Sequence, residues 1–229
     1  MQLRRLTHAD LFDVADVHVA AFPRAAVSQL GRGAVRRYYE TLLACDPRCV
    51  GHGAFVGNRL AGFCFTGRRF EIEPEFLRRH RLFLAARAAL HPWVIFDPLF
   101  RNRLLAGLRH LLRRPVLPAP PAGNGAASNP ADDRAQEEES FGVQYLVVDP
   151  RHQGQGIGRD LLHAAENRAR AQGRRRVELS VFTDNAPAIT FYERQGWQKI
   201  VSGSRWEGLM AKHLLAPALV AAQQSAASL

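Results

Sequence analysis

Apolar positions in the first third of the chain follow a helical spacing and then a strand spacing. After a short strand-like start at 1–6, they recur every three or four residues at Leu11, Val14, Ala15, Val17, Ala21 and Phe22, which predicts an amphipathic helix. Thr7 is placed to cap this helix, with Asp10 completing a capping-box pattern. A second helix is predicted over 33–44, and a hairpin follows, in which 54–56 and 60–66 flank a tight Gly-Asn-Arg turn.

The last third of the chain alternates strand and helix patterns. Residues 141–150 form a run rich in β-branched and aromatic residues, which predicts a buried strand. A helix follows to about Gln172, with Gly173 as its C-cap. Residues 175–182 predict another strand, 186–196 a helix that Gly196 stops, and 197–215 two closing strands. This pattern indicates an α/β (α+β) protein with a central sheet flanked by helices.

The middle of the chain has a different character. Residues 74–114 are rich in arginine, leucine and aromatic residues, and Pro92 and Pro98 divide them into at least two helices. Residues 115–139 have the composition of a flexible linker. We therefore expect five units: 1–69 and 140–216 as the two halves of one domain, 70–114 as an Arg-rich helical insertion, 115–139 as a linker and 217–229 as a tail.

The net charge of the chain favours anionic partners but does not distinguish between the kinds of anion. The net charge is +10 and the isoelectric point about 10.6, which favours anionic partners: phosphorylated metabolites, nucleic acid or acidic membranes. A genome-wide preference for arginine explains the excess equally well. No nucleic-acid reading motif is present, so nucleic acid is not expected as a partner. Segment 74–114 is interpreted as core packing or a homodimer contact, with peripheral membrane contact as the alternative.

Cysteine content and hydropathy indicate the compartment. Three cysteines at irregular spacing fit a reducing environment better than a disulfide framework. Cys45, Cys49 and His52 lack a nearby fourth ligand, so no metal site is expected. No apolar run reaches the roughly 18 residues of a membrane span, and the N-terminus lacks a signal core. The expected location is cytoplasmic.

Three glycines at alternate positions, Gly154, Gly156 and Gly158, stand where a helix begins. Glycine is a poor helix former, so a purely structural reason for three is weak. Helix N-termini leave backbone amides unpaired, and glycines let an anion reach them. The segment is therefore interpreted as a pyrophosphate site, with Arg151 and Arg159 adding charge. It matches neither the P-loop pattern nor the dinucleotide-binding fingerprint.

These residues carry a family resemblance. The segment "VVDPRHQGQGIG" at 147–158 resembles motif A of the GNAT superfamily, the Gcn5-related N-acetyltransferases. The segment "NAPAITFYERQGW" at 185–197 resembles motif B of the same superfamily. The order and distance of the two motifs agree with the family, whereas residues 1–67 match its first half in order only. The resemblance implies the GNAT fold, a mixed and mostly antiparallel twisted sheet, here with a helical insertion.

The resemblance also implies a donor and a chemistry. Acetyl-CoA is the expected co-substrate, with no metal, and its arm is expected along a fourth strand that splays from the fifth. The residues expected to contact it are Leu146, Val147, Val148, Arg151, Gln153, Gly154, Gln155, Gly156, Ile157, Gly158, Arg159 and Asn185. Tyr192 is expected to protonate the departing thiolate. The alternatives are a core role for Tyr192 and a simple helix cap for Asn185.

The general base is less clear from the residues. Some family members place a glutamate five residues before the motif-B asparagine, where this chain has Ser180. Glu178, two residues earlier on the same strand face, is the first candidate. Glu139 and a water relay are the others, and both carboxylates can also be structural.

The acceptor is expected near residues 21–39. This stretch weakly resembles GNAT-like proteins of bacterial surface polysaccharide synthesis, which implies an amino-sugar nucleotide. Four arginines would then hold a second pyrophosphate, unless they form an ordinary solvated helix face: Arg24, Arg32, Arg36 and Arg37. The expected function is transfer of acetyl to a primary amine of a small molecule by direct attack. The alternatives are an inactive acyl-CoA sensor or scaffold, and a protein N-terminal or lysine acetyltransferase.

Overall fold

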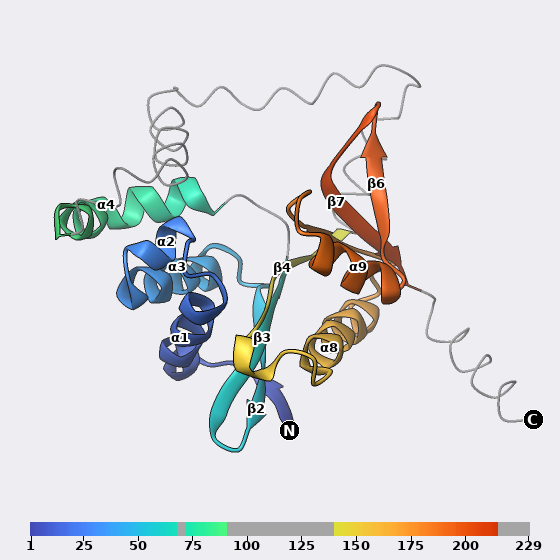
Figure 1. Ribbon diagram of the computed structural model, residues 1–229, viewed down its shortest axis with the longest axis horizontal. Helices are drawn as coiled ribbons and strands as arrows, with labels where there is room; N and C mark the ends of the chain where they lie inside the picture. The colour runs from blue at the N-terminus through green and yellow to red at the C-terminus, as the bar shows by residue number, and fades with distance from the viewer. Residues whose placement is uncertain (68–71, 91–139, 215–229) are drawn as a thin grey trace, which may run out of the picture.

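The fold is built on one sheet of seven strands, seen in a computed structural model that describes residues 1–67, 72–90 and 140–214. The strands are β1 Gln2–Arg5, β2 Val50–Val56, β3 Arg59–Gly67, β4 Ser140–Val148, β5 Arg176–Ser180, β6 Gln198–Ser202 and β7 Arg205–His213. Their order across the sheet is β1-β2-β3-β4-β5-β7-β6. Only β4 and β5 run parallel, and every other neighbouring pair is antiparallel. This confirms the predicted mixed, mostly antiparallel sheet (Figure 1).

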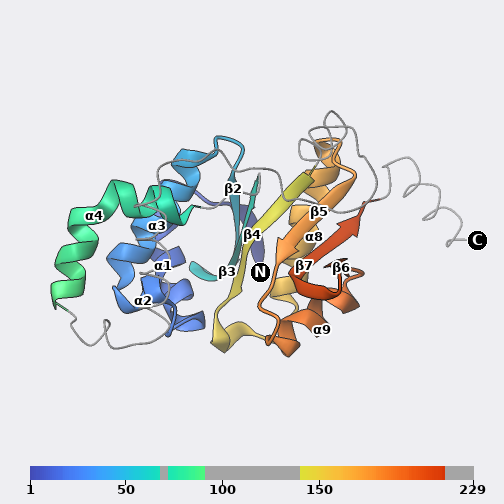
Figure 2. The same cartoon turned by 90° about the horizontal axis from the view of Figure 1, so that it is seen from above.

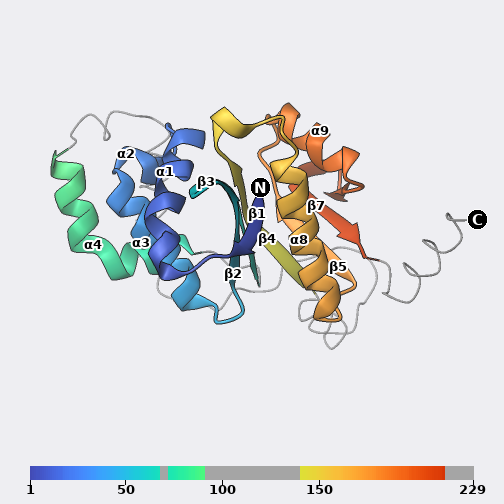
Figure 3. The ribbon, with the colours of Figure 1, turned by 90° about the horizontal axis from the view of Figure 1, so that it is seen from below.

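Helices cover both faces of the sheet. The α-helices in the described residues are α1 Leu11–Ala21, α2 Ala26–Gln29, α3 Arg32–Cys45, α4 Glu73–Leu90, α8 Ile157–Ala171 and α9 Ala186–Arg194. Two separate hydrophobic clusters result. One lies between the sheet and helices α1, α3 and α4, and the other lies between α8 and the part of the sheet that includes β5 and β7. Figures 2 and 3 show α1–α4 on one side of β3 and β4, and α8 on the other.

The predicted short-range features are present. The Asp10 carboxylate accepts hydrogen bonds from the Thr7 amide and hydroxyl, as the capping pattern predicts. Gly173 and Gly196 adopt left-handed φ values of 71° and 80° just after α8 and α9, a conformation that favours glycine. One prediction is wrong: Phe22 lies beyond the end of α1 and is 39% exposed, because the helix stops at Ala21.

Helix α4 packs on the N-terminal half of the fold. Its side chains Phe76 and Leu84 are buried in the cluster of α1 and α3, and the Arg87 Nε donates to the Leu30 carbonyl at 2.8 Å. The described part of the insertion therefore packs on the core, while the homodimer and membrane contacts stay predictions. None of the helices in the described residues is long and apolar enough to cross a membrane. The expected break at Pro92 and Pro98, the 115–139 linker and the 217–229 tail lie outside the described residues.

Strand β4 changes its side-chain pattern at a bulge. Phe65 of β3 faces Tyr145, but the next residue, Thr66, faces Val143, so Gln144 is an extra residue in β4. Before this bulge, Phe141 and Val143 face α8; beyond it, Tyr145 and Val147 face α1 and α3. The pairing of β4 with β5 ends at the same place, since its last matched pair is Val143 with Leu179.

A buried ionic network joins α8, α9 and β7. The Glu166 carboxylate, 2% exposed, accepts two hydrogen bonds from Lys212 Nζ and one from the Trp197 indole. Lys212 also donates to the Gln195 carbonyl at the end of α9. A buried charge is tolerated when it is paired and fully hydrogen-bonded in this way. The network therefore fixes α9 relative to α8.

Stability should fall between pH 6.5 and pH 4 because of His18. This imidazole is buried under α3, its Nδ1 lies 2.8 Å from the Tyr39 hydroxyl, and burial lowers its pKa from 6.5 to about 4. Between pH 6.5 and pH 4, His18 binds a proton in the unfolded chain but stays neutral in the folded chain. Acid therefore favours unfolding by up to about 3 kcal/mol. We expect the free energy of unfolding, measured with urea, to lose this much over the window.

The variant His18→Asn isolates this effect. It should be less stable at pH 7 yet show a flatter dependence on pH, whereas the half-buried His52 and His80, whose pKa values burial also lowers, contribute equally to both proteins. If the free energy of unfolding fell equally with pH in wild type and variant, His18 would not titrate in this window.

Candidate active site

The start of α8 presents a row of unpaired backbone amides. Gly154 and Gly156 have φ values of 77° and 82°, which turn the chain sharply before the helix. None of the amides from Gly154 to Arg159 donates a hydrogen bond to any described residue; the first to do so is Asp160, which bonds to the Gly156 carbonyl. Six adjacent donors at a helix N-terminus form a site for an anion.

The glycines keep this turn open for different reasons. A Cβ at Gly154 would meet nothing within 4 Å, so this residue is needed for its backbone angle alone. A Cβ at Gly156 would approach the Arg159 guanidinium at 3.3 Å, in addition to the strain of a positive φ. Gly158 has ordinary helical geometry, and a Cβ there would meet the Phe191 ring at 3.5 Å and a Val148 methyl at 3.6 Å.

The two arginines beside the turn differ in their partners. Arg151 forms a two-point ion pair with the buried Asp149, and this hydrogen bond lowers the pKa of Asp149 to about 2. The pair anchors the turn to the end of β4. Arg159 pairs with its neighbour Asp160 at 3.2 Å and remains 58% exposed, so its guanidinium is available beside the amides. Gln153 and Gln155 also lie at this turn, with their amide nitrogens 3.5 Å from the Val148 and Arg151 carbonyls.

The end of β4 offers main-chain groups on its unpaired side. The Asp149 amide donates to the Ala61 carbonyl of the β3 side, so Asp149 and, by alternation, Val147 direct their main chain at β3. Leu146 and Val148 consequently direct theirs away from β3, where β5 no longer pairs. Of the three residues predicted to contact the donor through main chain, these two have the required orientation, and Val147 does not.

Asn185 and Tyr192 lie at opposite ends of α9. The Asn185 side chain accepts a hydrogen bond from the Ala188 amide at 3.2 Å, so it caps the helix as one of the alternatives predicted. Tyr192 packs between the rings of Phe191 and Trp197, and burial raises the pKa of its phenol. Its hydroxyl has no hydrogen-bond partner among the described residues. It is thus protonated over the ordinary pH range and has a proton to donate.

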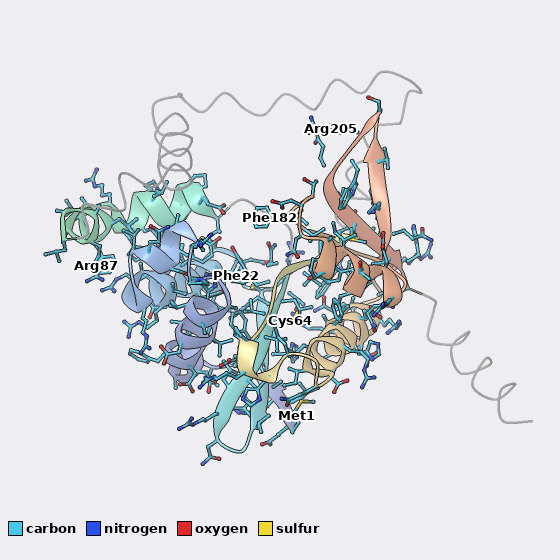
Figure 4. The ribbon with its side chains drawn as sticks, viewed as in Figure 1. Met1, Phe22, Cys64, Arg87, Phe182 and Arg205 are labelled. Atoms are coloured by element: carbon cyan, nitrogen blue, oxygen red, sulfur yellow. The ribbon has the colours of Figure 1, made fainter. Side chains whose placement is uncertain are left out.

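Cys64 is a neighbour that sequence analysis did not connect to the site. It lies on β3 opposite Leu146, near the middle of the molecule in Figure 4, and close enough to act on the pKa of Tyr192. Burial raises the pKa of this fully buried thiol, so it is not a ready nucleophile. No motif marks it, because its proximity arises only from the pairing of β3 with β4.

The face opposite α8 carries the candidate bases. Val177 and Leu179 of β5 are buried against α8, so Glu178 and Ser180 point to the other face, the one Tyr145 also occupies. The Glu178 carboxylate pairs with Arg176 at 2.8 Å and is 14% exposed. Glu139 lies outside the described residues.

Three of the four arginines of the predicted acceptor region contact other side chains. Arg32 pairs with Asp16 at 2.9 Å, and Arg36 with Glu40 at 3.1 Å. Arg37 lies over the Phe83 ring at 3.9 Å. These contacts leave both the phosphate-binding prediction and the solvated-face alternative as predictions. In the described residues no group of three or more metal-ligating side chains is assembled.

Comparison with known proteins relates the C-terminal part of the chain to one family. A sequence model of the acetyltransferase (GNAT) family matches residues 121–197, which include the glycine turn, Asn185 and Tyr192. Over this segment the chain resembles the GNAT family. Solved GNAT structures agree in fold: the PaiA N-acetyltransferase of Thermoplasma acidophilum in complex with coenzyme A has a TM-score of 0.52 at 16% identity, covering 93% of this chain and 98% of that one. A ribosomal-protein-alanine N-acetyltransferase of Brucella melitensis gives 0.52 at 15% identity, covering 93% and 100%.

Curated GNAT relatives match only in part. A mycothiol acetyltransferase of Actinosynnema mirum is 40% identical over 73 residues, 31% of this chain and 23% of that protein. A streptothricin acetyltransferase of Streptomyces lavendulae is 35% identical over 81 residues, 33% of this chain and 43% of that protein. An uncharacterized N-acetyltransferase of Methanocaldococcus jannaschii is 39% identical over 64 residues, 28% of each. The chain thus spans less than half the length of each of these relatives.

Proposed function

We propose that this protein is an N-acetyltransferase that moves acetyl from acetyl-CoA to a primary amine of a small molecule. The observation that carries the proposal is the row of six unpaired amides from Gly154 to Arg159, next to Arg159 and to the unpaired side of β4. A diphosphate fits the amides because they supply donors and the positive end of a helix dipole. An extended amide-containing arm fits Leu146 and Val148, which direct main-chain donors and acceptors to the same side.

Tyr192 is the proposed general acid. Transfer of acetyl breaks a carbon–sulfur bond, and the departing sulfur needs a proton. The Tyr192 hydroxyl holds one at every ordinary pH and has no competing partner among the described residues. Because α9 is tied to α8 through Lys212 and Glu166, the hydroxyl keeps a fixed position relative to the amide row. No cysteine step is needed, and attack by the neutral amine is direct.

An amino-sugar nucleotide is the acceptor that the sequence favours, and it remains part of the proposal. The names of the mycothiol and streptothricin acetyltransferases support a small molecule, but each matches only about a third of this chain, and the family model matches residues 121–197 only. We expect α1–α4 to contribute to the choice of acceptor. Figure 4 shows the exposed ring of Phe22, just after α1, on the same side of the molecule as α1–α4, and the exposed ring of Phe182, just after β5, across from it.

A thiol-release assay tests the proposal. Purified protein, acetyl-CoA and an amine panel are combined, and free CoA thiol is measured; the panel holds amino-sugar nucleotides, aminoglycosides, polyamines, amino acids and peptides. We expect turnover with a small-molecule amine and a rise in melting temperature with acetyl-CoA. A rise in melting temperature without turnover would indicate an inactive acyl-CoA sensor. Turnover with peptides alone would indicate a protein acetyltransferase. Absence of both effects would reject the proposal.

Glu178→Gln tests the carboxylate that the sequence offers as base. If Glu178 takes the proton from the amine, the variant should lower turnover roughly 100-fold below the amine's own pKa. The control is Arg176→Gln, which removes the ion pair and leaves the carboxylate in place. Full turnover in Glu178→Gln would limit Glu178 to pairing with Arg176.

A further inference from the structure

A pair of tyrosines on the acceptor side is joined by a short hydrogen bond. The hydroxyls of Tyr38 on α3 and Tyr145 on β4 lie 2.5 Å apart, although the residues are 107 positions apart in sequence. Their rings meet edge to face at 5.9 Å, and the Tyr39 and Phe76 rings hold them from either side. This packing leaves the two hydroxyls little freedom to separate.

The pair leads from the site to the surface. Tyr145 follows the bulge at Gln144, where β4 leaves β5, and it directly precedes Leu146, whose main chain is turned to the unpaired side. Tyr38 is buried, and its hydroxyl lies 3.4 Å from the carboxylate of Glu73, at the long end of hydrogen-bonding range. Glu73 is exposed at the start of α4. Three oxygen-bearing groups thus form one line from β4 to solvent.

Direct attack requires that the ammonium group of the acceptor first lose a proton. The line of Tyr145, Tyr38 and Glu73 supplies a route for this proton to solvent. Resting on the proposed function, we infer that Tyr145 takes this proton and that Tyr38 and Glu73 pass it to solvent. The amine N–H bond breaks, and its electron pair stays on nitrogen. A new O–H bond forms at Tyr145 while its own proton moves to Tyr38, whose proton moves to the Glu73 carboxylate and then to water. Both tyrosines end neutral, and no charge is left in the core.

The neutral state of Tyr38 agrees with this route. Burial raises the pKa of Tyr38 well above 10, so the hydroxyl conducts a proton without becoming a tyrosinate. The titratable groups around the pair include His18 of α1, Tyr39 of α3, Glu73 and His80 of α4, and Glu178 of β5. His80 contacts the Phe76 ring that packs on Tyr38, and burial lowers its pKa. Burial keeps His18 neutral above about pH 4, and Glu178 is paired with Arg176. Glu73 is the carboxylate in line with the pair.

Two phenylalanine variants and a matched control test the relay, using the full chain and an amine that the panel shows to be a substrate. Tyr145→Phe and Tyr38→Phe should each lower kcat roughly 100-fold at neutral pH, with the double variant no worse, because both interrupt one path. The KM for acetyl-CoA should not change. Tyr39→Phe, which removes the neighbouring buried hydroxyl that contacts His18, should keep kcat within about twofold.

The pH profile separates a relay from a structural role. Above the pKa of the amine used as substrate, the acceptor arrives deprotonated, so both variants should approach the wild-type kcat. Loss at every pH, or unchanged kcat in Tyr145→Phe, would overturn the relay. Wild type that binds acetyl-CoA but turns over no amine would overturn the proposed function and the relay with it. Wild-type turnover with a full loss in Glu178→Gln and none in Tyr145→Phe would reject the relay alone.

Discussion

Tyr192→Phe should lower kcat by roughly 100-fold while leaving the Kd for acetyl-CoA within about twofold. The substitution removes one oxygen and keeps the ring, so the packing against Phe191 and Trp197 is retained. The hydroxyl has no partner in the described residues, and its removal leaves no polar group stranded. The loss should therefore fall on the chemical step, measured as steady-state thiol release beside calorimetric binding of acetyl-CoA.

The pH dependence adds a second check on Tyr192. Because burial raises the pKa of the phenol above 10, the proton is present throughout the assay range, and wild type should show no loss of kcat from Tyr192 ionising below about pH 10. Tyr39→Phe, a variant with the same loss of one buried hydroxyl, serves as the control for non-specific effects. Unchanged kcat in Tyr192→Phe would place the residue in the core only.

Gly156→Ala should weaken acetyl-CoA binding at least about tenfold, equivalent to about 1.4 kcal/mol. At φ 82° an alanine is strained, and its Cβ would press on the Arg159 guanidinium at 3.3 Å. The turn can relieve this strain only by rotating the peptide groups that hold the unpaired amides in line. The measurement is the calorimetric Kd for acetyl-CoA and for free coenzyme A.

The same helix provides a matched control in Gly173→Ala. Gly173 has φ 71° at the other end of α8, and a Cβ there meets nothing within 4 Å. Both variants should lose roughly 1–2 kcal/mol of stability from backbone strain, whereas only Gly156→Ala should lose affinity. Equal affinity in the two variants would show that the amide row is not where the diphosphate binds.

The donor side of the site was predictable because its signals are local. Glycines with positive φ, a capping asparagine and a helix start depend on residues within a few positions of one another, so Gly156, Gly173 and Asn185 could be interpreted directly. Strand β4 pairs with β5 no further than Val143. This agrees with the expected splay of the two strands. The resemblance to GNAT motifs added the order of the strands, which no short-range signal contains.

The acceptor side was not predictable in this way. The arginines of 21–39 were interpreted as possible phosphate ligands from charge alone, yet Asp16, Glu40 and Phe83 occupy three of them. Tyr38 and Tyr145 carried no signal at all, because a hydrogen bond between residues 107 positions apart depends on how α3 packs on β4.

By itself, the sequence determined the elements, the turn before α8 and the family, since backbone preferences and capping act over a few residues. Only the tertiary structure decided which groups meet across the sheet. The bulge at Gln144 moves Tyr145 to the face of α1 and α3, the register of β3 places Cys64 beside Leu146, and the end of the β4–β5 pairing exposes Leu146 and Val148. A shift of one residue in a strand reverses every side chain on it, and this register is set by packing that no single segment encodes.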